Sequence, residues 1–176
     1  FTPTESQGPG SYTFTVSVTD GNTTDSEEIT VTVNEANVVP TGNADSATTL
    51  EDTAKDITLT ATDSDLPAQT LVYSIENNPT HGSVDLTGAL ATYTPEANYN
   101  GSDSFTFKVN DGGADSDPAT ISMTVSAVND SPSASADTAS VDEDATLTIA
   151  KSTLVANDSD IDGDSLSLTS VSNPTN

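Results

Sequence analysis

Apolar and polar residues alternate along much of this chain, with the period of two that a half-buried β-strand gives. The clearest run places Tyr12, Phe14 and Val16 on one face, with hydroxyl side chains between them. Similar runs fall at residues 29–33, 47–50, 55–61, 70–76, 83–86, 89–94, 103–110 and 118–126, and shorter ones pair Leu147 with Ile149 and Leu166 with Leu168. The pattern predicts an all-β protein whose core includes the alternating aromatic residues Tyr12, Phe14, Phe105 and Phe107.

Tight turns separate the predicted strands. Asp or Asn precedes Gly at Asp20-Gly21, Asn100-Gly101, Asp111-Gly112 and Asp162-Gly163, and such pairs provide the positive φ that short turns need. Asp20 and Asp111 are therefore expected to be turn residues, with metal ligation as the second interpretation. Asp103 is expected in a turn or on the surface, and His81 in a hairpin. About seven strands in about 100 residues predict a two-sheet antiparallel sandwich.

The chain repeats itself with a period close to one domain. Glu51 recurs as Glu143, 92 residues later, and Asp63 recurs as Asp158, 95 residues later. This spacing predicts a complete repeat over residues 38–130. The C-terminal part of one repeat (residues 1–37) precedes it, and the N-terminal part of another (residues 131–176) follows it. Two interpretations stay open: the chain is a window on a long array, or its two partial repeats complete each other between neighbouring chains in a head-to-tail filament.

Charge and composition narrow the possible partners. The net charge is −25, with three Lys and Arg residues in all and no Cys. Phosphate contacts need Lys and Arg, so this balance excludes nucleic acid and argues against an anionic membrane surface. No apolar run is long enough to be inserted in a membrane. One His, no Cys and no nucleophile elbow or phosphate loop argue against an enzyme. Divalent cations are the expected means of neutralising so many carboxylates.

The densest acidic segment is residues 158–164, which contains Asp158, Asp160, Asp162 and Asp164. Calcium needs six to eight oxygen ligands, and an oxygen-rich loop with a Gly turn can supply them. The twelfth position of an EF-hand would fall on Thr169 rather than on Glu, so an EF-hand is rejected. The equivalent loop of the complete repeat keeps Asp63 and Asp65 but has Pro67 and Gln69 at the other two positions. Asp162 and Asp164 are therefore expected to bind an extra ion or none.

Several segments together resemble the cadherin repeat. Residues 60–65 end in Asp63-Ser64-Asp65, similar to the cadherin Asp-x-Asp calcium motif, and residues 128–132 resemble the cadherin linker with its Asn-Asp-x-Pro core. Residues 93–95 (Tyr-Thr-Pro) and 99–105 (Tyr-Asn-Gly-x-Asp-x-Phe) are similar to cadherin-like tandem repeats of large bacterial surface adhesins. The resemblance implies immunoglobulin- or cadherin-like β-sandwiches arranged end to end.

The resemblance also implies Ca²⁺ at the junctions between repeats. One junction would use Glu51, Asn129, Asp130, Asp158 and Asp160, and the other Asn37, Asp63 and Asp65. Glu143 occupies the position of Glu51 in the next copy. Because Val38 stands where the other linker has Asp130, the first junction is expected to bind calcium more weakly.

The function that this implies is a calcium-stiffened stalk or filament segment of an extracellular bacterial adhesin, whose partners are neighbouring repeats. The alternative is a carbohydrate-binding module attached to a secreted enzyme. Such a site presents exposed aromatic residues, and Tyr99 is the candidate here because the other aromatic residues mostly alternate inward.

Overall fold

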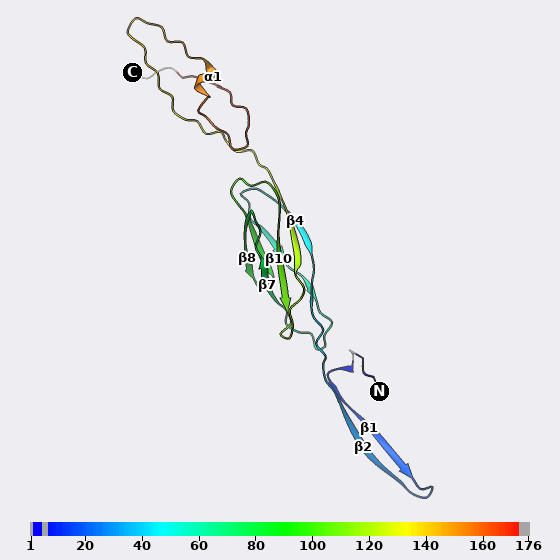
Figure 1. The fold of residues 1–176 in the computed structure, drawn as a ribbon. Coiled ribbons are helices and arrows are strands. Elements are labelled where there is room, and N and C mark those ends of the chain that lie inside the picture. Colours follow the sequence, from blue (N-terminus) through cyan, green and yellow to red (C-terminus); the bar gives the residue numbers. More distant parts are fainter. Residues whose placement is uncertain (1, 5–6, 173–176) are drawn as a thin grey trace. The chain divides into compact units, whose positions relative to one another are not determined.

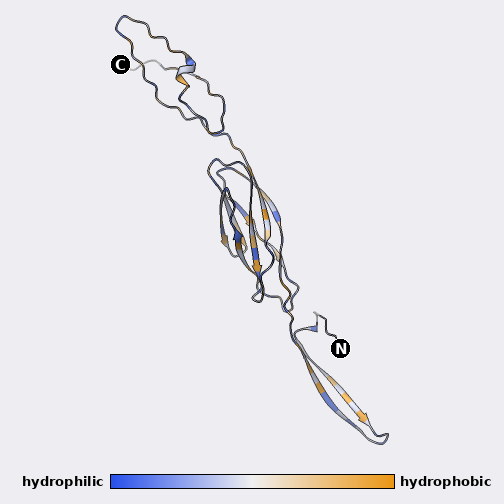
Figure 2. Ribbon diagram, viewed as in Figure 1, coloured by the Kyte–Doolittle hydropathy of each residue, from blue (hydrophilic) through white to orange (hydrophobic). Residues whose placement is uncertain are grey.

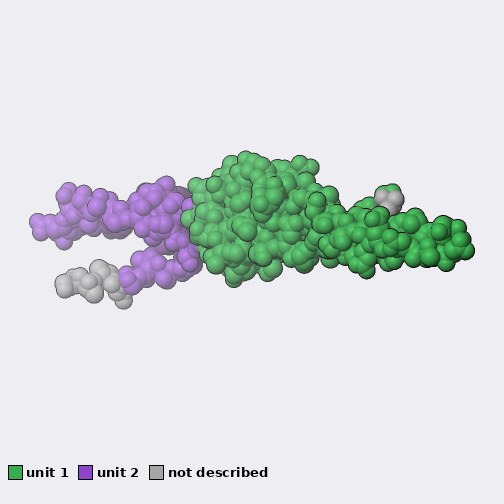
Figure 3. All heavy atoms as spheres, turned by 90° about the horizontal axis from the view of Figure 1, so that it is seen from below, with its two compact units in different colours: residues 1–126 green, residues 127–176 purple. Residues whose placement is uncertain are grey.

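The computed structural model describes residues 2–4 and 7–172, and almost all of its regular structure is β-strand (Figure 1). The chain divides into two compact units, Phe1–Ser126 and Ala127–Asn176, which Figure 3 colours separately. No described helix is long and apolar enough to cross a membrane.

A β-sandwich forms most of the first unit. Its larger sheet has the order β4-β11-β10-β7, its smaller sheet has the order β5-β9-β8, and a short β3–β6 pair adjoins them. The bounds are Thr41–Gly42 for β3, Asp45–Leu50 for β4, Lys55–Thr58 for β5, Ala61–Thr62 for β6, Val72–Asn77 for β7, Gly82–Thr87 for β8, Leu90–Pro95 for β9, Gly101–Asn110 for β10 and Ala119–Ser126 for β11. All pairs are antiparallel except β4 with β11, which is parallel. The predicted sandwich is thus confirmed, with one parallel pair added.

The core lies between the two sheets and follows the alternation of the sequence. β10 buries Phe105, Phe107 and Val109, and every second residue of the neighbouring β11 is buried as well. The smaller sheet contributes Ile57, Ala91 and Tyr93 to the same cluster. The prediction that Phe105 and Phe107 are core residues is confirmed.

The first unit also contains a long hairpin, β1 (Gly10–Thr19) with β2 (Thr24–Val33). Figure 2 shows apolar residues recurring along both strands. Here the predicted burial is wrong: Phe14 is 44% exposed and Val18 is 66% exposed. Tyr12 is only half-buried, and its hydroxyl donates to the Gln7 carbonyl at 2.7 Å. The alternation matches that of β10 and β11, but no second sheet covers this face in the described part of the chain.

The second unit differs from the sequence-based expectation. Residues 127–172 contain no strand, only an isolated bridge between Ser133 and Ser159, and a short helix α1 spans Lys151–Leu154. The strands predicted at Leu147–Ile149 and Leu166–Leu168 are therefore wrong. In the sandwich of the first unit, β4 pairs with β11, β7 with β10 and β5 with β9. Counterparts of β9, β10 and β11 do not occur within residues 131–172, so these segments lack the partners that a strand's backbone groups need.

Candidate metal centre

Three carboxylates meet at one end of the sandwich and form what we call the N-terminal acidic cluster: Asp63, Asp65 and Asp111. Their oxygen atoms all lie within 4.8 Å of one another. Asp63 and Asp65 follow β6. Asp111 follows β10, the strand before the last one of the sandwich, and is far from them in sequence. Asp65 is only 3% exposed and Asp111 only 6%. Three buried or half-buried negative charges this close repel each other strongly unless a cation or several donors face them.

Backbone N–H groups satisfy part of this cluster. The Val38 N–H donates to both oxygens of Asp65, at 3.0 and 3.1 Å. Asp63 Oδ1 accepts from the Asp65 N–H at 2.9 Å. Asp63 Oδ2 is shielded from solvent and accepts no hydrogen bond from the residues that the structure describes. Among the described residues, no donor therefore offsets the repulsion between Asp63 Oδ2 and the neighbouring carboxylates.

Asp111 divides its two oxygens between two tasks. Its Oδ1 accepts from the N–H groups of Gly113 (2.6 Å) and Ala114 (2.7 Å) and so closes the predicted turn. These bonds from Ala114 and Gly113 hold the pKa of Asp111 below its usual value. Its Oδ2 accepts from the Asn37 side chain at 3.0 Å. Asp20, at the corresponding place in the β1–β2 hairpin, is a turn residue as predicted, accepting from Asn22 and Thr23.

Side-chain amides complete the N-terminal acidic cluster. Asn37 Oδ1 accepts from Gln69 Nε2 at 3.3 Å, and the same Nε2 donates to Asp65 Oδ2 at 2.8 Å. Gly113 leaves room for Asn37, because a Cβ at Gly113 would lie 2.6 Å from Asn37 Oδ1. The structure therefore brings together Asn37, Asp63 and Asp65, which the sequence singled out. It adds Asp111, which sequence reasoning placed mainly in a turn, and Gln69.

No lysine neutralises these carboxylates. Lys108 pairs instead with Glu76 at 2.9 Å, and within the described part of the chain no lysine forms an ion pair with Asp63, Asp65 or Asp111. The amide and backbone donors occupy lone pairs but carry no net positive charge. Carboxylate and amide oxygens are the ligand types that Ca²⁺ prefers, so the N-terminal acidic cluster could hold such an ion.

The second unit gathers the other acidic segment around one cavity. Asn129, Asp130, Asp158, Asp160 and Asp164 contribute to the lining of this cavity, which has a volume of about 450 Å³. The loop is organised by its own carboxylates: Asp160 Oδ1 accepts from the N–H groups of Asp162 (3.0 Å) and Asp164 (3.4 Å).

Hydrogen bonds join residues 130–135 to the acidic loop of residues 158–164 within the second unit. The Asp130 N–H donates to Asp162 Oδ2 at 2.7 Å, and the Ser135 N–H donates to Asp158 Oδ1 at 2.8 Å. All six predicted ligands of this segment therefore lie close together: Asn129, Asp130, Asp158, Asp160, Asp162 and Asp164.

The two repeat-related glutamates have different surroundings. Glu51 lies just after β4, is 3% exposed, and donates its backbone N–H to the Ser126 carbonyl at 2.9 Å. Glu143 is exposed in a turn closed by a hydrogen bond from Ala145 to Asp142, and its side chain has no hydrogen bond or ion pair with any described residue. Metal ligation by Glu51 and Glu143 stays a prediction.

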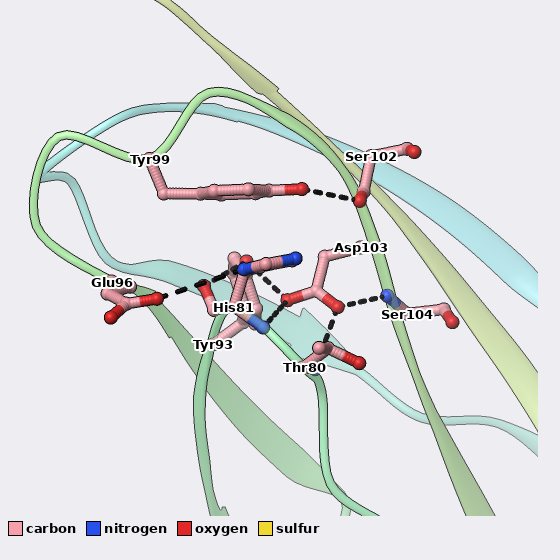
Figure 4. Close-up of polar contacts among 8 residues, drawn as sticks. All are labelled: Thr80, His81, Tyr93, Glu96, Tyr99, Ser102, Asp103 and Ser104. Carbon is pink, nitrogen blue, oxygen red and sulfur yellow. Dashed lines mark hydrogen bonds and ion pairs between the residues drawn. The ribbon is translucent and has the colours of Figure 1, made fainter.

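Asp103 is neither a turn residue nor a free surface carboxylate, contrary to expectation. It lies in β10, and four donors surround it (Figure 4): the N–H groups of Thr80 (3.0 Å), Ser104 (2.8 Å) and His81 (3.0 Å), and the Tyr93 hydroxyl (3.0 Å). Burial raises the pKa of Asp103, but the hydrogen bonds outweigh it and the pKa lies below its usual value. Burial, with Asp103 as the second cause, raises the pKa of Tyr93 well above its usual value.

The Tyr99 side chain contacts the residues around Asp103 and does not stand free as a binding surface. Its ring stacks on that of His81, with centroids 4.1 Å apart and planes inclined by 10°. Its hydroxyl donates to the Ser102 carbonyl at 2.7 Å, as Figure 4 shows. One ring face and the hydroxyl are therefore already used within the protein. This arrangement explains Tyr99 without a bound sugar.

Comparisons with known proteins agree with this architecture. The family model of a bacterial Ig domain matches residues 37–124, which is half of the chain, and that of a cadherin-like domain matches residues 128–176. The structure is similar to human mucin-like protocadherin EC1-2, with a TM-score of 0.52, 19% identity and 73% of each chain covered. It is also similar to protocadherin gamma B2 extracellular cadherin domains 1–5, with a TM-score of 0.53, 18% identity, and 81% of this chain and 30% of that chain covered.

The remaining comparisons gave a weak structural likeness or no match. An endo-fucoidan hydrolase from glycoside hydrolase family 107 gives a TM-score of 0.41 at 24% identity and 68% coverage of this chain, which spans only 19% of the hydrolase. No curated protein matches the chain. At these identities the solved structures show the fold alone, and immunoglobulin- and cadherin-like domains are typically non-catalytic. The chain belongs to the bacterial Ig domain family, and the match to the cadherin-like domain model lies C-terminal to the residues that the Ig model covers.

Proposed function

We propose that this chain is a calcium-binding structural segment of an extracellular bacterial surface protein, and that Ca²⁺ at its junctions stiffens the array of repeats. Bacterial Ig domains are typically found outside the cell or on its surface, which supports the location. The observation that carries the proposal is the N-terminal acidic cluster. Its carboxylates bind Asn37 and Val38, which belong to the segment joining the β1–β2 hairpin to the sandwich.

The same oxygens would hold both the linker and an ion. Asp63, Asp65, Asp111 and Asn37 Oδ1 offer oxygen ligands, and water would complete the six to eight that Ca²⁺ requires. Without an ion, three carboxylates repel each other and weaken the attachment of the linker. With an ion, their charge is offset, and the linker is fixed to the sandwich because Asn37 is a member of the site.

The expected affinity fits an extracellular location. Calcium modules outside cells bind with a Kd of roughly 10⁻⁴–10⁻³ M, so millimolar calcium would occupy many such sites. At ten times its Kd, one ion stabilises the bound state by about 1.4 kcal/mol. Tandem repeats combine such contributions through their nearest-neighbour interfaces, so several modest sites can stiffen a long array.

Small-angle scattering tests this proposal. We expect calcium to lengthen the average particle relative to chelator, and Asp63→Asn/Asp65→Asn to lose part of that response. The exposed pair Glu28→Gln/Asp85→Asn makes the same change in charge outside the loops that form the cluster and should respond like the parent. Superimposable profiles with calcium and with chelator would remove the stiffening proposal.

The partners that we propose are neighbouring repeats of the same kind. The exposed apolar residues of the β1–β2 hairpin support this, because the equivalent face of β10 and β11 is covered by a second sheet. Sedimentation of the chain over a range of concentrations distinguishes the possibilities. Concentration-dependent association would support pairing of repeats between chains. A monomer at every concentration would restrict the contacts between repeats to those within one chain.

A further inference from the structure

Gln69 is the one neutral side chain that donates into the N-terminal acidic cluster from the same loop as Asp63 and Asp65. Its Nε2 lies 2.8 Å from Asp65 Oδ2 and 3.3 Å from Asn37 Oδ1. Both acceptors are among the oxygens that the proposed calcium site would use. An amide carries two N–H donors on one nitrogen, so it can satisfy both acceptors at once.

These bonds continue a chain of contacts across the cluster. Asn37 donates to Asp111 Oδ2 and accepts from Gln69, which in turn donates to Asp65. The linker is thereby attached to loops that follow two different strands, with no positive charge involved. The lone pairs of Asp65 and Asn37 that face Gln69 Nε2 cannot face a cation at the same time.

We propose that Gln69 sets the calcium affinity of this cluster by competing with the ion. In the calcium-free form the Gln69 amide holds Asp65 and Asn37 together. When the ion binds, the amide leaves, and its two hydrogen bonds must be given up. The result is a junction whose linker is weakened less by the loss of calcium than carboxylate repulsion alone would cause, and which binds calcium more weakly than it otherwise would. This inference rests on the proposed function, since it concerns the affinity of the same site.

The repeat supports this assignment. The residue 95 positions after Gln69 is Asp164, and Asp63 and Asp65 recur at the same spacing as Asp158 and Asp160. Asp164 contributes to the lining of the cavity in the second unit together with Asp158 and Asp160. One copy therefore has a carboxylate, a possible ligand, where the other copy has an amide that donates. An N–H donor at a cation site opposes binding, whereas a carboxylate favours it.

A calcium titration of the whole 176-residue chain, followed by NMR, measures this site separately from the other. The backbone N–H groups of Val38 and Gly113 donate to Asp65 and Asp111, so their signals report on this cluster. We expect Gln69→Ala to bind calcium about threefold to tenfold more tightly, because two hydrogen bonds no longer have to be broken. Gln69→Asp should gain about tenfold or more. Thr70→Ala, an exposed neighbour, should match the parent.

The side-chain amide of Gln69 gives a second readout. The chain has only two Gln residues, so the two NH₂ signals are assigned by their loss in Gln69→Ala. On adding calcium, the Gln69 signal should move to the position of a free amide while that of Gln7 stays in place. Unchanged signals from β10 and β11 show that each variant is folded.

The outcomes separate the two proposals. Equal or weaker binding by Gln69→Ala overturns the competition, and weaker binding would mean that the Gln69 carbonyl is itself a ligand. If the Val38 and Gly113 signals do not respond to calcium in the parent or in any variant, the calcium site itself is absent, and the proposed function fails together with this inference.

Discussion

The Asn37 side chain donates to Asp111 Oδ2 at 3.0 Å, although 74 residues separate the two in sequence. The contact joins the segment after β2 to the loop after β10. Asp111 uses its other oxygen to close its own turn, so one carboxylate serves both a local and a long-range purpose. Asp20 has only the local part of this arrangement, which makes it a matched reference.

Asp111→Asn should lower calcium affinity at the N-terminal acidic cluster by about tenfold, or about 1.4 kcal/mol. The new side chain can keep the turn, since its carbonyl can still accept from Gly113 and Ala114. It removes one negative charge and places an N–H group opposite Asn37. Calorimetry with Asp20→Asn as the control measures the difference, and equal losses in the two variants would mean that Asp111 is only a turn residue.

Tyr93→Phe should destabilise the sandwich by about 1–2 kcal/mol in urea denaturation. The hydroxyl that it removes donates to Asp103, and the Tyr93 side chain is completely buried. Tyr99→Phe removes a hydroxyl from an exposed hydrogen bond and should cost less than about 0.5 kcal/mol. Similar costs for both substitutions would show that the three backbone N–H donors satisfy Asp103 without the Tyr93 hydroxyl.

Stability should fall in acid partly through Asp103. Its folded-state pKa lies below the unfolded value of 3.8, so its contribution is fully present above that value and is lost as the pH falls through the folded pKa. Asp103→Asn should be less stable than the parent at neutral pH, and the gap should narrow below about pH 4. Denaturant unfolding across this range measures the gap, with the exposed Asp85→Asn as control. A gap that is constant with pH would contradict the assignment.

Equivalent aromatic residues in the two repeat copies should differ sharply in cost. Phe105→Ala should lower the free energy of unfolding by about 3–5 kcal/mol, because Phe105 is fully buried between the sheets. Phe14→Ala should cost less than about 1 kcal/mol, because Phe14 is largely exposed on the hairpin. Urea denaturation measures both. A comparable loss at Phe14 would mean that the hairpin face is covered in solution, as pairing between repeats would require.

The alternation of apolar and polar residues correctly predicted the strands of the sandwich. The alternation of Phe105, Phe107 and Val109 predicted a strand with one buried face, and that face is buried. All seven strand segments predicted between residues 47 and 126 contain strands of the structure. A period of two is a property of neighbouring residues, so it can be read without knowing the partner strand.

Where the partner matters, the pattern was insufficient. Phe14 has the same alternation as Phe105 but remains exposed, and Leu147 and Ile149 alternate without forming a strand. Burial needs a second sheet and a strand needs hydrogen-bonding neighbours, and neither condition is written in the segment itself.

The candidate site divides in the same way. Sequence alone identified Asn37, Asp63 and Asp65 through the repeat and the resemblance, because those residues recur at fixed spacing. Only the tertiary structure placed Asp111 beside them and turned the Gln69 amide toward Asp65. The loops that follow β6 and β10 meet because their strands belong to one sandwich, and electrostatic repulsion acts through space rather than along the chain.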